Sequence, residues 1–381
     1  MIYLDNNATT PVDPRVRDAM LPFLGEKYGN PSSPHAAGRE ARRAVEEARA
    51  QVAALLGAPA ESVVFTSGGT ESVNTAIRGA LAAQPHKRHV VTSSIEHSAV
   101  KNLCEQLERE GWAMTRLRVD ADGRPDLDEY RRALRDDTAL VTVVWANNET
   151  GVLFPVEEMA RIADERRIVF HADAVQAAGK VAIDLREFPA HLVSVSAHKL
   201  HGPKGAGALF VRAGLGLPPL LLGGGQENGR RAGTENVPGI VGFGVAAELA
   251  KLASVQEMPR VLSMRNRFED GLRERFPSVV FHGHREFRLP NTSNFALPGL
   301  DAQSLLAVLD RLGVACSIGS ACSSGVPDAS HVLRAMGVDD GEARASLRFS
   351  FSRMNTGHDV DGALHALVQA VQRLGPAGMG D

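Results

Sequence analysis

Short β-branched and aromatic runs alternate with helical patterns from about residue 60 to residue 212, and this rhythm constrains the fold more than any other feature. The runs are too continuously apolar for half-exposed hairpins, so they predict a buried, mostly parallel sheet. Strands are expected at residues 63–65, 89–94, 139–145, 167–173, 191–197 and 207–211. The predicted fold class is α/β, with helices packed on the sheet.

Helical periodicity fills the intervals between these strands. Within residues 97–110, Val100, Leu103 and Cys104 recur at spacings of three and four, which predicts a helix with one buried face. Cys104 is therefore expected to fill the core. Residues 36–57 carry a second amphipathic pattern of the same kind.

The rhythm changes after about residue 250. A charged helix is expected at about 256–275, followed by a less regular order that is typical of a smaller α+β unit. The expected elements there are strands at 279–281, 292–297 and 345–351, and helices at 301–312 and 358–373. Because 381 residues are enough for two cores, we predict a large domain at 13–250 and a small domain made of 1–12 with 251–381.

Composition argues against several classes of protein. The net charge of -3, without long charged runs, gives no field for binding nucleic acid directly. No apolar run approaches the roughly 20 residues that span a membrane, and MIYLDNNATTP lacks the features of a signal peptide. Three cysteines without a CxxC pair do not form a disulfide framework or a cysteine-rich zinc site, so a cytoplasmic setting is expected.

Polar, chemically capable residues follow the predicted strands, where ligands of open α/β sheets collect. The glycine-rich turn TSGGTES (66–72) opens a helix and can hold a phosphate on its backbone N–H groups. The residues after the other strands are His97, Asn147, Asn148, Asp173, Gln176, His198 and Lys199. Each alone has a structural interpretation, such as a helix cap for His97 or a solvated charge for Lys199.

Together these groups match the needs of pyridoxal 5′-phosphate (PLP). Its phosphate requires an anion cradle, its ring nitrogen requires a carboxylate that keeps it protonated, and its aldehyde requires a lysine. Asp173 supplies the carboxylate. Of the two lysines in SAHKLHGPKG, Lys199 follows the strand end directly, whereas Lys204 lies in a GPKG turn. The sequence therefore predicts a PLP site with Lys199 as its lysine.

Eight stretches in one order span nearly the whole chain. They are LDNNATTP (4–11), TSGGTES (66–72), SSIEHSAV (93–100), WANNETG (145–151), HADAVQAAG (171–179), SAHKLHGPKG (196–205), GGGQENGRRAGTEN (223–236) and SIGSACSSG (317–325). In these stretches the chain resembles the cysteine desulfurases of the NifS/IscS-like group, within the class V family of PLP-dependent aminotransferases. The resemblance implies a fold-type I PLP-dependent transferase that converts L-cysteine to L-alanine.

The resemblance also implies a role for individual cofactor-binding residues. Lys199 would be the Schiff-base lysine, Asp173 the partner of the ring nitrogen, and Gln176 a donor to the phenolic oxygen of the ring. His97 would stack on the ring and help to move protons, and Asn148 would contribute to the same site. The phosphate ligands would be Gly69, Thr70, Ser196 and His198, joined by Thr234 from the other subunit of a homodimer.

On the substrate side, Asn148 and Arg348 would bind the carboxylate of L-cysteine. Cys322 would be the nucleophile that takes the sulfur as a persulfide and passes it to an acceptor protein. The serine- and glycine-rich stretch around Cys322 suits a thiol that must reach both places. Cys316, beside Val314 and Ala315, is instead expected to be buried and inert.

The acceptor implied by the resemblance is an iron–sulfur scaffold protein or another protein that undergoes thiolation. No resident metal site is expected, and Cys322 is the candidate for transient ligation of an iron–sulfur cluster beside such a scaffold. Two alternatives within the family are a PLP-dependent aminotransferase, which gives Cys322 no role, and a selenocysteine lyase. A regulatory subunit without activity is a third, but the intact Lys199, Asp173 and Cys322 argue against it.

Overall fold

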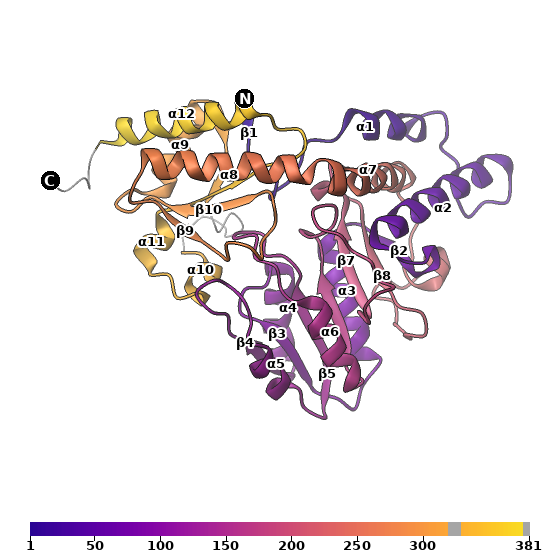
Figure 1. Ribbon diagram of the computed structural model, residues 1–381. Coiled ribbons are helices and arrows are strands. Elements are labelled where there is room, and N and C mark those ends of the chain that lie inside the picture. Colours follow the sequence, from indigo (N-terminus) through magenta and orange to yellow (C-terminus); the bar gives the residue numbers. More distant parts are fainter. Residues whose placement is uncertain (319–328, 376–381) are drawn as a thin grey trace.

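A computed structural model describes residues 1–318 and 329–375. Within these ranges a seven-stranded sheet in the order β2-β8-β7-β6-β5-β3-β4 occupies the centre of the larger part (Figure 1). β8 is antiparallel to both neighbours, and the other adjacent pairs are parallel. The strands are β2 (Val63–Thr66), β3 (His89–Ser93), β4 (Ala113–Leu117), β5 (Thr138–Val144), β6 (Val169–Asp173), β7 (Leu192–Ser196) and β8 (Gly207–Val211). The predicted mostly parallel sheet is confirmed.

β4 is a strand that the sequence pattern did not predict. It forms the edge of the sheet beside β3, and Arg116 within it is exposed. Only Leu117 of its five residues is buried, so β4 lacks the continuous apolar run that marks the central strands.

Successive side chains of the central strands enter two different cores. Val64 and Leu140 belong to the core shared with α3 and α4, whereas Phe65 and Val141 belong to the core on the opposite face. Side chains of a strand alternate between the two faces of a sheet. Both faces must therefore be apolar when helices cover both, which explains why these strands show no polar alternation.

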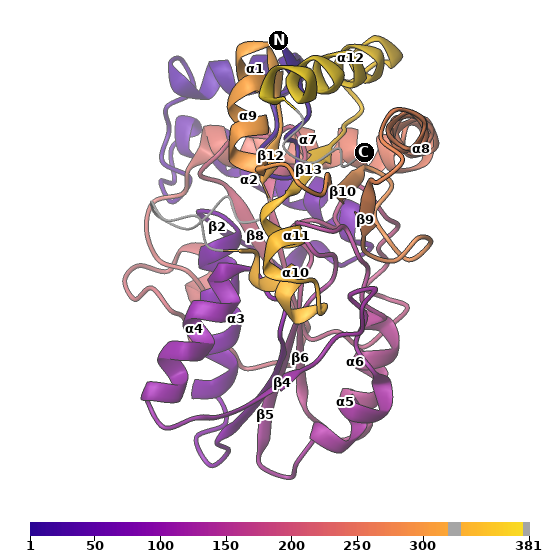
Figure 2. The ribbon, with the colours of Figure 1, turned by 90° about the vertical axis from the view of Figure 1, so that its left-hand side faces the viewer.

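Helices cover both faces of this sheet. Figure 2 shows α3 and α4 on one face and α5 and α6 on the other. The helices up to residue 256 are α1 (Pro14–Met20), α2 (Ala36–Leu56), α3 (Gly69–Ala82), α4 (Ser98–Arg109), α5 (Leu127–Ala133), α6 (Val156–Glu165) and α7 (Val237–Gln256). Short 3-10 turns are η1 (Leu21–Leu24), η2 (Ala60–Ser62), η3 (Ala197–Lys199) and η4 (Gln226–Gly229). α2 and α4 confirm the two amphipathic helices that were predicted, and Cys104 is buried as expected.

Among the described residues, α7 is the one helix whose length and hydropathy are sufficient to cross a membrane. This is weak support for a membrane span, since core helices of soluble proteins pass the same test. α7 packs along α2 so closely that a Cβ placed at Gly244 would lie 2.6 Å from the Cα of Ala48. Its buried residues include Ile240 and Phe243, so α7 has the character of a core helix.

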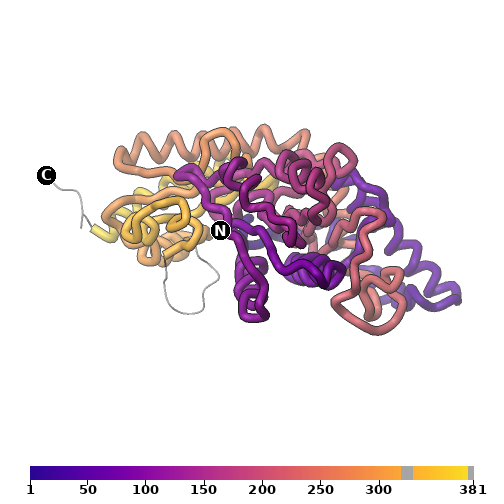
Figure 3. The backbone as a smooth tube through the Cα atoms, turned by 90° about the horizontal axis from the view of Figure 1, so that it is seen from below, coloured from indigo at the N-terminus to yellow at the C-terminus, as the bar shows by residue number. Residues whose placement is uncertain are grey.

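Most of the elements after residue 257, together with Leu4, build a separate core. The strands β12-β13-β10-β9 form an antiparallel sheet in that order, and β1 pairs with β11. Figure 3 shows the C-terminal elements at one end of the molecule and α2 at the other. The elements are β1 (Ile2–Tyr3), α8 (Met258–Arg275), β9 (Val280–His282), β10 (Thr292–Ala296), α9 (Ala302–Arg311), β11 (Val314–Ala315), β12 (Ser317–Ile318), α10 (His331–Ala335), α11 (Asp340–Arg344), β13 (Ser346–Ser350) and α12 (Gly357–Leu374).

α10 and α11 pack differently from the other elements of this part. Val332, Leu333 and Ala343 belong to the core of the large sheet rather than to the separate C-terminal core. The division into domains at 13–250 and at 1–12 with 251–381 stays a prediction, and these two helices lie across it.

The N-terminal segment joins the two cores at the carboxyl edge of the large sheet. Asp5 forms a bridge with Ser350 of β13, and the backbone N–H of Thr10 donates to the carbonyl of His198 at 3.0 Å. Residues 5–10 therefore run past η3, where the strand β7 ends and Lys199 lies.

Candidate active site

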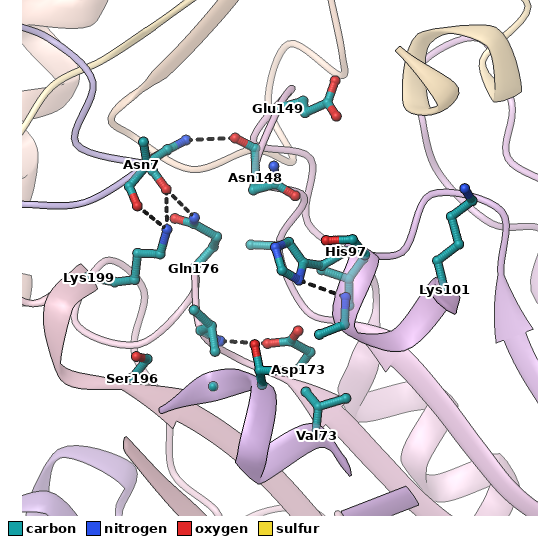
Figure 4. A pocket seen from close by; sticks show the side chains of 18 of the residues that line it. Asn7, Val73, His97, Lys101, Asn148, Glu149, Asp173, Gln176, Ser196 and Lys199 are labelled. Atoms are coloured by element: carbon teal, nitrogen blue, oxygen red, sulfur yellow. Dashed lines mark hydrogen bonds between the residues drawn. The ribbon is translucent and has the colours of Figure 1, made fainter. Parts of the chain in front are cut away.

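A cavity of about 620 Å³ opens at the carboxyl ends of the parallel strands (Figure 4). All but two of the residues predicted for the site line it. These lining residues are Gly69, Thr70, His97, Asn148, Asp173, Gln176, Ser196, His198, Lys199 and Arg348. The exceptions are Thr234, which is exposed outside the cavity, and Cys322, which lies outside the described residues.

The N-terminus of α3 opens into this cavity and can hold an anion. Gly68 is the N-cap, and no side chain caps the first N–H groups of the helix. A Cβ at Gly69 would lie 2.9 Å from Cγ2 of Val175, so the turn has no room for a larger residue without a shift of Val175. Free backbone N–H groups and the positive end of a 14-residue helix attract a phosphate. Ser196 and His198 line the same cavity.

Asp173 is a buried carboxylate at the end of β6 that lines the cavity. Its Oδ1 accepts a hydrogen bond from the N–H of Val175 at 3.0 Å. Burial raises the pKa of Asp173, while the neighbouring His97 and Lys199 act in the opposite direction. A buried carboxylate whose partner is a cation stays ionised, so Asp173 suits a protonated ring nitrogen in the cavity.

His97 both caps a helix and lines the cavity. Its Nδ1 accepts a hydrogen bond from the N–H of Ala99 at 3.2 Å, which caps α4. The same ring lines the cavity beside Asp173 (Figure 4). Burial lowers the pKa of His97, so the imidazole is neutral when the cavity carries no added negative charge. The cap fixes the ring in place without consuming its Nε2.

Lys199 is held by the N-terminal segment. Its Nζ donates to the carbonyl of Asn7 and, at 2.8 Å, to that of Ala8. Asn7 O also accepts from Nε2 of Gln176 at 2.8 Å, so one carbonyl joins two of the predicted cofactor ligands (Figure 4). The motif LDNNATTP was noted in the sequence, but no role was assigned to Asn7 because nothing local places residue 7 beside residue 199.

The adjacent asparagines of WANNETG separate in the structure. Asn147 is buried, and its side chain donates to the carbonyl of Ile95 at 3.0 Å and accepts from the N–H of Glu149 at 2.8 Å. It therefore holds the turn after β5. Asn148 lines the cavity instead, and its carbonyl accepts from Nδ2 of Asn7 at 3.1 Å.

Arg348 enters the cavity from the C-terminal core. On β13, Leu347 and Phe349 face that core, whereas Arg348 lines the cavity. Its Nη2 donates to Oδ1 of Asp5 at 2.8 Å and its Nη1 to the carbonyl of Asn148 at 3.1 Å. Nε is buried and has no hydrogen-bond partner among the described residues. The guanidinium is thus fixed and retains a donor for an incoming carboxylate.

These residues fit PLP. The uncapped helix end suits the phosphate, Asp173 suits the ring nitrogen, and Lys199 suits the aldehyde, all within the same cavity. The described residues contain no cluster of His, Cys, Asp or Glu that could hold a metal ion.

Comparison with known proteins agrees with this fit. A family model described as aminotransferase class-V matches residues 2–362. The chain belongs to the class-V aminotransferase family. Enzymes of this family related to cysteine desulfurases depend on PLP, and PLP is the cofactor of this chain.

This class-V aminotransferase chain is similar to proteins of known activity over nearly its whole length. It is 49% identical over 374 residues to cysteine desulfurase 2 of Trichormus variabilis, covering 98% of this chain and 94% of the relative. It is 48% identical over 374 residues to the cysteine desulfurase NifS of Azotobacter vinelandii, covering 98% and 93%. The solved structure of a NifS-like protein superimposes with a TM-score of 0.91 at 37% identity, covering 97% of this chain and 98% of that chain.

Cys104 and Cys316, the two cysteines that are not predicted to act as the nucleophile, are both buried. Burial raises the pKa of Cys104 to about 12 and also raises that of Cys316. Neither thiol forms the thiolate required of a sulfur nucleophile near neutral pH. The prediction that Cys316 is buried is confirmed, and the residue lies between β11 and β12.

Thr234 lies in the stretch 223–236, which three ion pairs hold on its own chain, one of them between Glu235 and Arg42 at 3.1 Å. Glu227 forms a buried pair with Arg49 at 2.7 Å, and Arg231 pairs at 2.9 Å with Glu71 in the first turn of α3. Thr234 itself is exposed. This stretch is therefore anchored at the phosphate turn of its own chain while Thr234 faces outward.

Proposed function

We propose that the protein is a cysteine desulfurase that takes sulfur from L-cysteine as a persulfide on Cys322 and releases L-alanine. The observation that carries this proposal is the cavity in which Lys199, Asp173 and Arg348 meet beneath an uncapped helix end. The likeness to named cysteine desulfurases over 98% of the chain supports the same reaction.

Bound PLP supplies an electron sink for the carbon atoms of an amino acid substrate, which is chemistry that no side chain offers. The residues of the chain position the reactants around it. Arg348 binds the carboxylate of L-cysteine, and Asn148 lies beside it. Lys199 Nζ accepts the proton from the α-carbon and returns a proton to it when alanine forms, and the neutral His97 ring carries protons between substrate atoms.

The sulfur step balances without an added oxidant. The thiolate of Cys322 attacks the substrate sulfur, a sulfur–sulfur bond forms, and the bond from Cβ to sulfur breaks. The electron pair of that bond remains with the carbon, which takes up a proton and becomes the methyl group of alanine. The products are L-alanine and a persulfide on Cys322.

Further parts of the proposal concern the setting of the reaction. We place the protein in the cytoplasm, because three cysteines in 381 residues indicate no disulfide framework. Its partner is a second copy of the chain, and its product persulfide supplies an iron–sulfur scaffold or another sulfur acceptor. Selenocysteine is a close alternative substrate, since the same bond to Cβ would break.

The test compares Cys322→Ser with Cys316→Ser in the PLP-loaded enzyme. Cys322→Ser should keep the visible absorbance of bound PLP but release almost no sulfide, because a hydroxyl is a poor nucleophile toward sulfur. Cys316→Ser should retain most of the turnover, since the Cys316 thiol is buried. Mass spectrometry after brief treatment with L-cysteine should place the added sulfur on the peptide with Cys322. Sulfur on Cys104 or Cys316 would refute the assignment.

A further inference from the structure

Lys180 is a lysine close to the cavity that the reaction described above does not use. It ends the turn after β6, and its Nζ donates to the backbone carbonyl of Gln176 at 3.0 Å and to its side-chain Oε1 at 2.9 Å. Both of these acceptors belong to Gln176, and neither is a carboxylate. Burial, together with the positive charges of Lys199 and Arg348, lowers the pKa of Lys180 to about 7.

A positive charge on the buried Lys180 lowers the stability of the folded protein. Lys180 also lines a second, small cavity of about 30 Å³ together with Lys199 and Arg353, so three basic side chains converge behind the active site. Burying an ammonium group costs its hydration, and placing it near other positive charges adds repulsion. Both effects disfavour folding unless the hydrogen bonds of the group compensate. Such an arrangement is typical of a functional site rather than of core packing.

The hydrogen bonds of Lys180 determine which way the amide of Gln176 points. Lys180 Nζ carries hydrogens in both of its protonation states and donates to Gln176, so the atom of the Gln176 amide that faces it is the carbonyl oxygen. Nε2 then lies on the other side, where it donates to the carbonyl of Asn7 at 2.8 Å. The amide nitrogen has a second hydrogen, and Gln176 lines the main cavity (Figure 4).

We propose that Lys180 is a positioning residue that fixes the amide of Gln176 so that its N–H, and not its carbonyl, faces the oxygen substituent of the bound cofactor. Asn7 supports the same orientation, because a carbonyl repels a flipped amide oxygen. Lys180 acts at one remove, since it contacts Gln176 and not the cavity. The proposal depends on the function proposed above only in that PLP occupies the cavity.

The experiment is a double-mutant cycle of Lys180→Met and Gln176→Ala in the holoenzyme. Two quantities are measured for each variant: the dissociation constant of PLP, and the pH midpoint at which the visible absorbance of bound PLP changes. Lys180→Met alone should weaken PLP binding roughly two- to tenfold, the worth of one hydrogen bond. It should also shift the absorbance midpoint. In the Gln176→Ala background both effects should disappear within error.

Three further variants serve as controls or as a replacement in this cycle. Lys180→Arg keeps the donors and should restore both quantities. Lys87→Met removes a lysine that also donates to a backbone carbonyl, that of Thr138, but lies away from the cavity, and it should change neither quantity. If Lys180→Met yields no soluble protein, Lys180→Ala replaces it in the cycle, since it also removes the donor to Gln176.

Equal effects of Lys180→Met in both backgrounds would overturn the proposal, because Lys180 would then act without Gln176. So would the absence of any effect in the wild-type background. A chain that shows the coupling but releases no sulfide from L-cysteine would contradict the proposed function and leave this inference standing. A wild-type chain that fails to bind PLP would refute both.

Discussion

Arg348 reaches the cavity with two of its donors already occupied. Asp5 pairs with Nη2 at 2.8 Å, and the carbonyl of Asn148 accepts from Nη1. These contacts fix the plane of the guanidinium before a substrate arrives, and the buried Nε remains without a partner within the described part of the chain. A carboxylate that meets a fixed fork loses less entropy on binding than one that meets a mobile lysine.

Arg348→Lys should raise the KM for L-cysteine roughly tenfold or more, because hydrogen bonds to a charged group are worth about 1.5–3 kcal/mol and an ammonium cannot reproduce the fork. The KM is measured from the steady-state rate of sulfide release at several concentrations of L-cysteine. Arg353→Lys is the matched control, since Arg353 pairs with Asp13 at 2.7 Å and does not line the active-site cavity. A raised KM in Arg353→Lys alone would show that Arg348 is the wrong arginine.

At the scale of elements, a buried carboxylate joins the turn after β3 to the neighbouring strand β5. Oε1 of Glu96 accepts from the backbone N–H of Val144 at 3.0 Å and from the hydroxyl of Ser93. Its Oε2 is buried and has no partner among the described residues. Burial raises the pKa of Glu96 from its ordinary value of 4.5 to about 8. Glu96 is therefore neutral in the folded protein near pH 7.

The raised pKa of Glu96 predicts a particular dependence of stability on pH. The folded state holds the proton that the unfolded state releases, so the contribution of Glu96 is complete below about pH 4.5 and is lost as the pH rises toward about 8. Within that window each pH unit lowers the free energy of unfolding by up to about 1.4 kcal/mol. Glu96→Gln, which cannot ionise, should lack this decline.

Thermal unfolding of the wild type and Glu96→Gln at about pH 5 and about pH 8 provides the measurement. The midpoint temperature of Glu96→Gln should rise relative to that of the wild type as the pH increases. Glu47→Gln, on the exposed face of α2, should show the same pH dependence as the wild type. A constant difference between wild type and Glu96→Gln at both pH values would mean that Glu96 is ionised in the folded protein.

At the scale of the whole molecule, the active site of a single chain lacks one predicted phosphate ligand. Thr234 is exposed, and the ion pair of Arg231 with Glu71 anchors its segment beside the chain's own phosphate turn. Exposed apolar side chains at Leu24, Tyr28 and Leu222 add surface that a second copy would cover. We expect a homodimer in which Thr234 reaches the partner's phosphate.

Thr234→Ala should then weaken PLP retention on dialysis while sedimentation still reports a dimer. Mixed dimers test the crossing directly. With Lys199→Ala in one chain and Thr234→Ala in the other, one site should remain intact and the dimer should keep about half of the activity. With both changes in the same chain, neither site should be intact. The reverse pattern would place Thr234 in the site of its own chain.

Much of the fold and of the site could be predicted from the sequence, because both periodicity and strand ends are local features. Continuous apolar runs marked the central strands, and parallel strands bring their carboxyl ends to one edge. Asp173, His97 and Lys199 could therefore be predicted from the sequence to lie near one another, and the structure places all three in one cavity. β4 was not predicted, because it is an edge strand that contains the exposed Arg116 and has no continuous apolar run.

Only the tertiary structure decided which distant or adjacent residues share the cavity. Asn7 and Arg348 meet there because Asp5 bridges Ser350 and β1 pairs with β11, contacts that no sequence period encodes. Packing likewise turned Asn147 into the core and Asn148 toward the cavity, although the two residues are chemically identical. The amphipathic pattern determined what each element buries, whereas the burial of two separate cores determined which elements lie side by side.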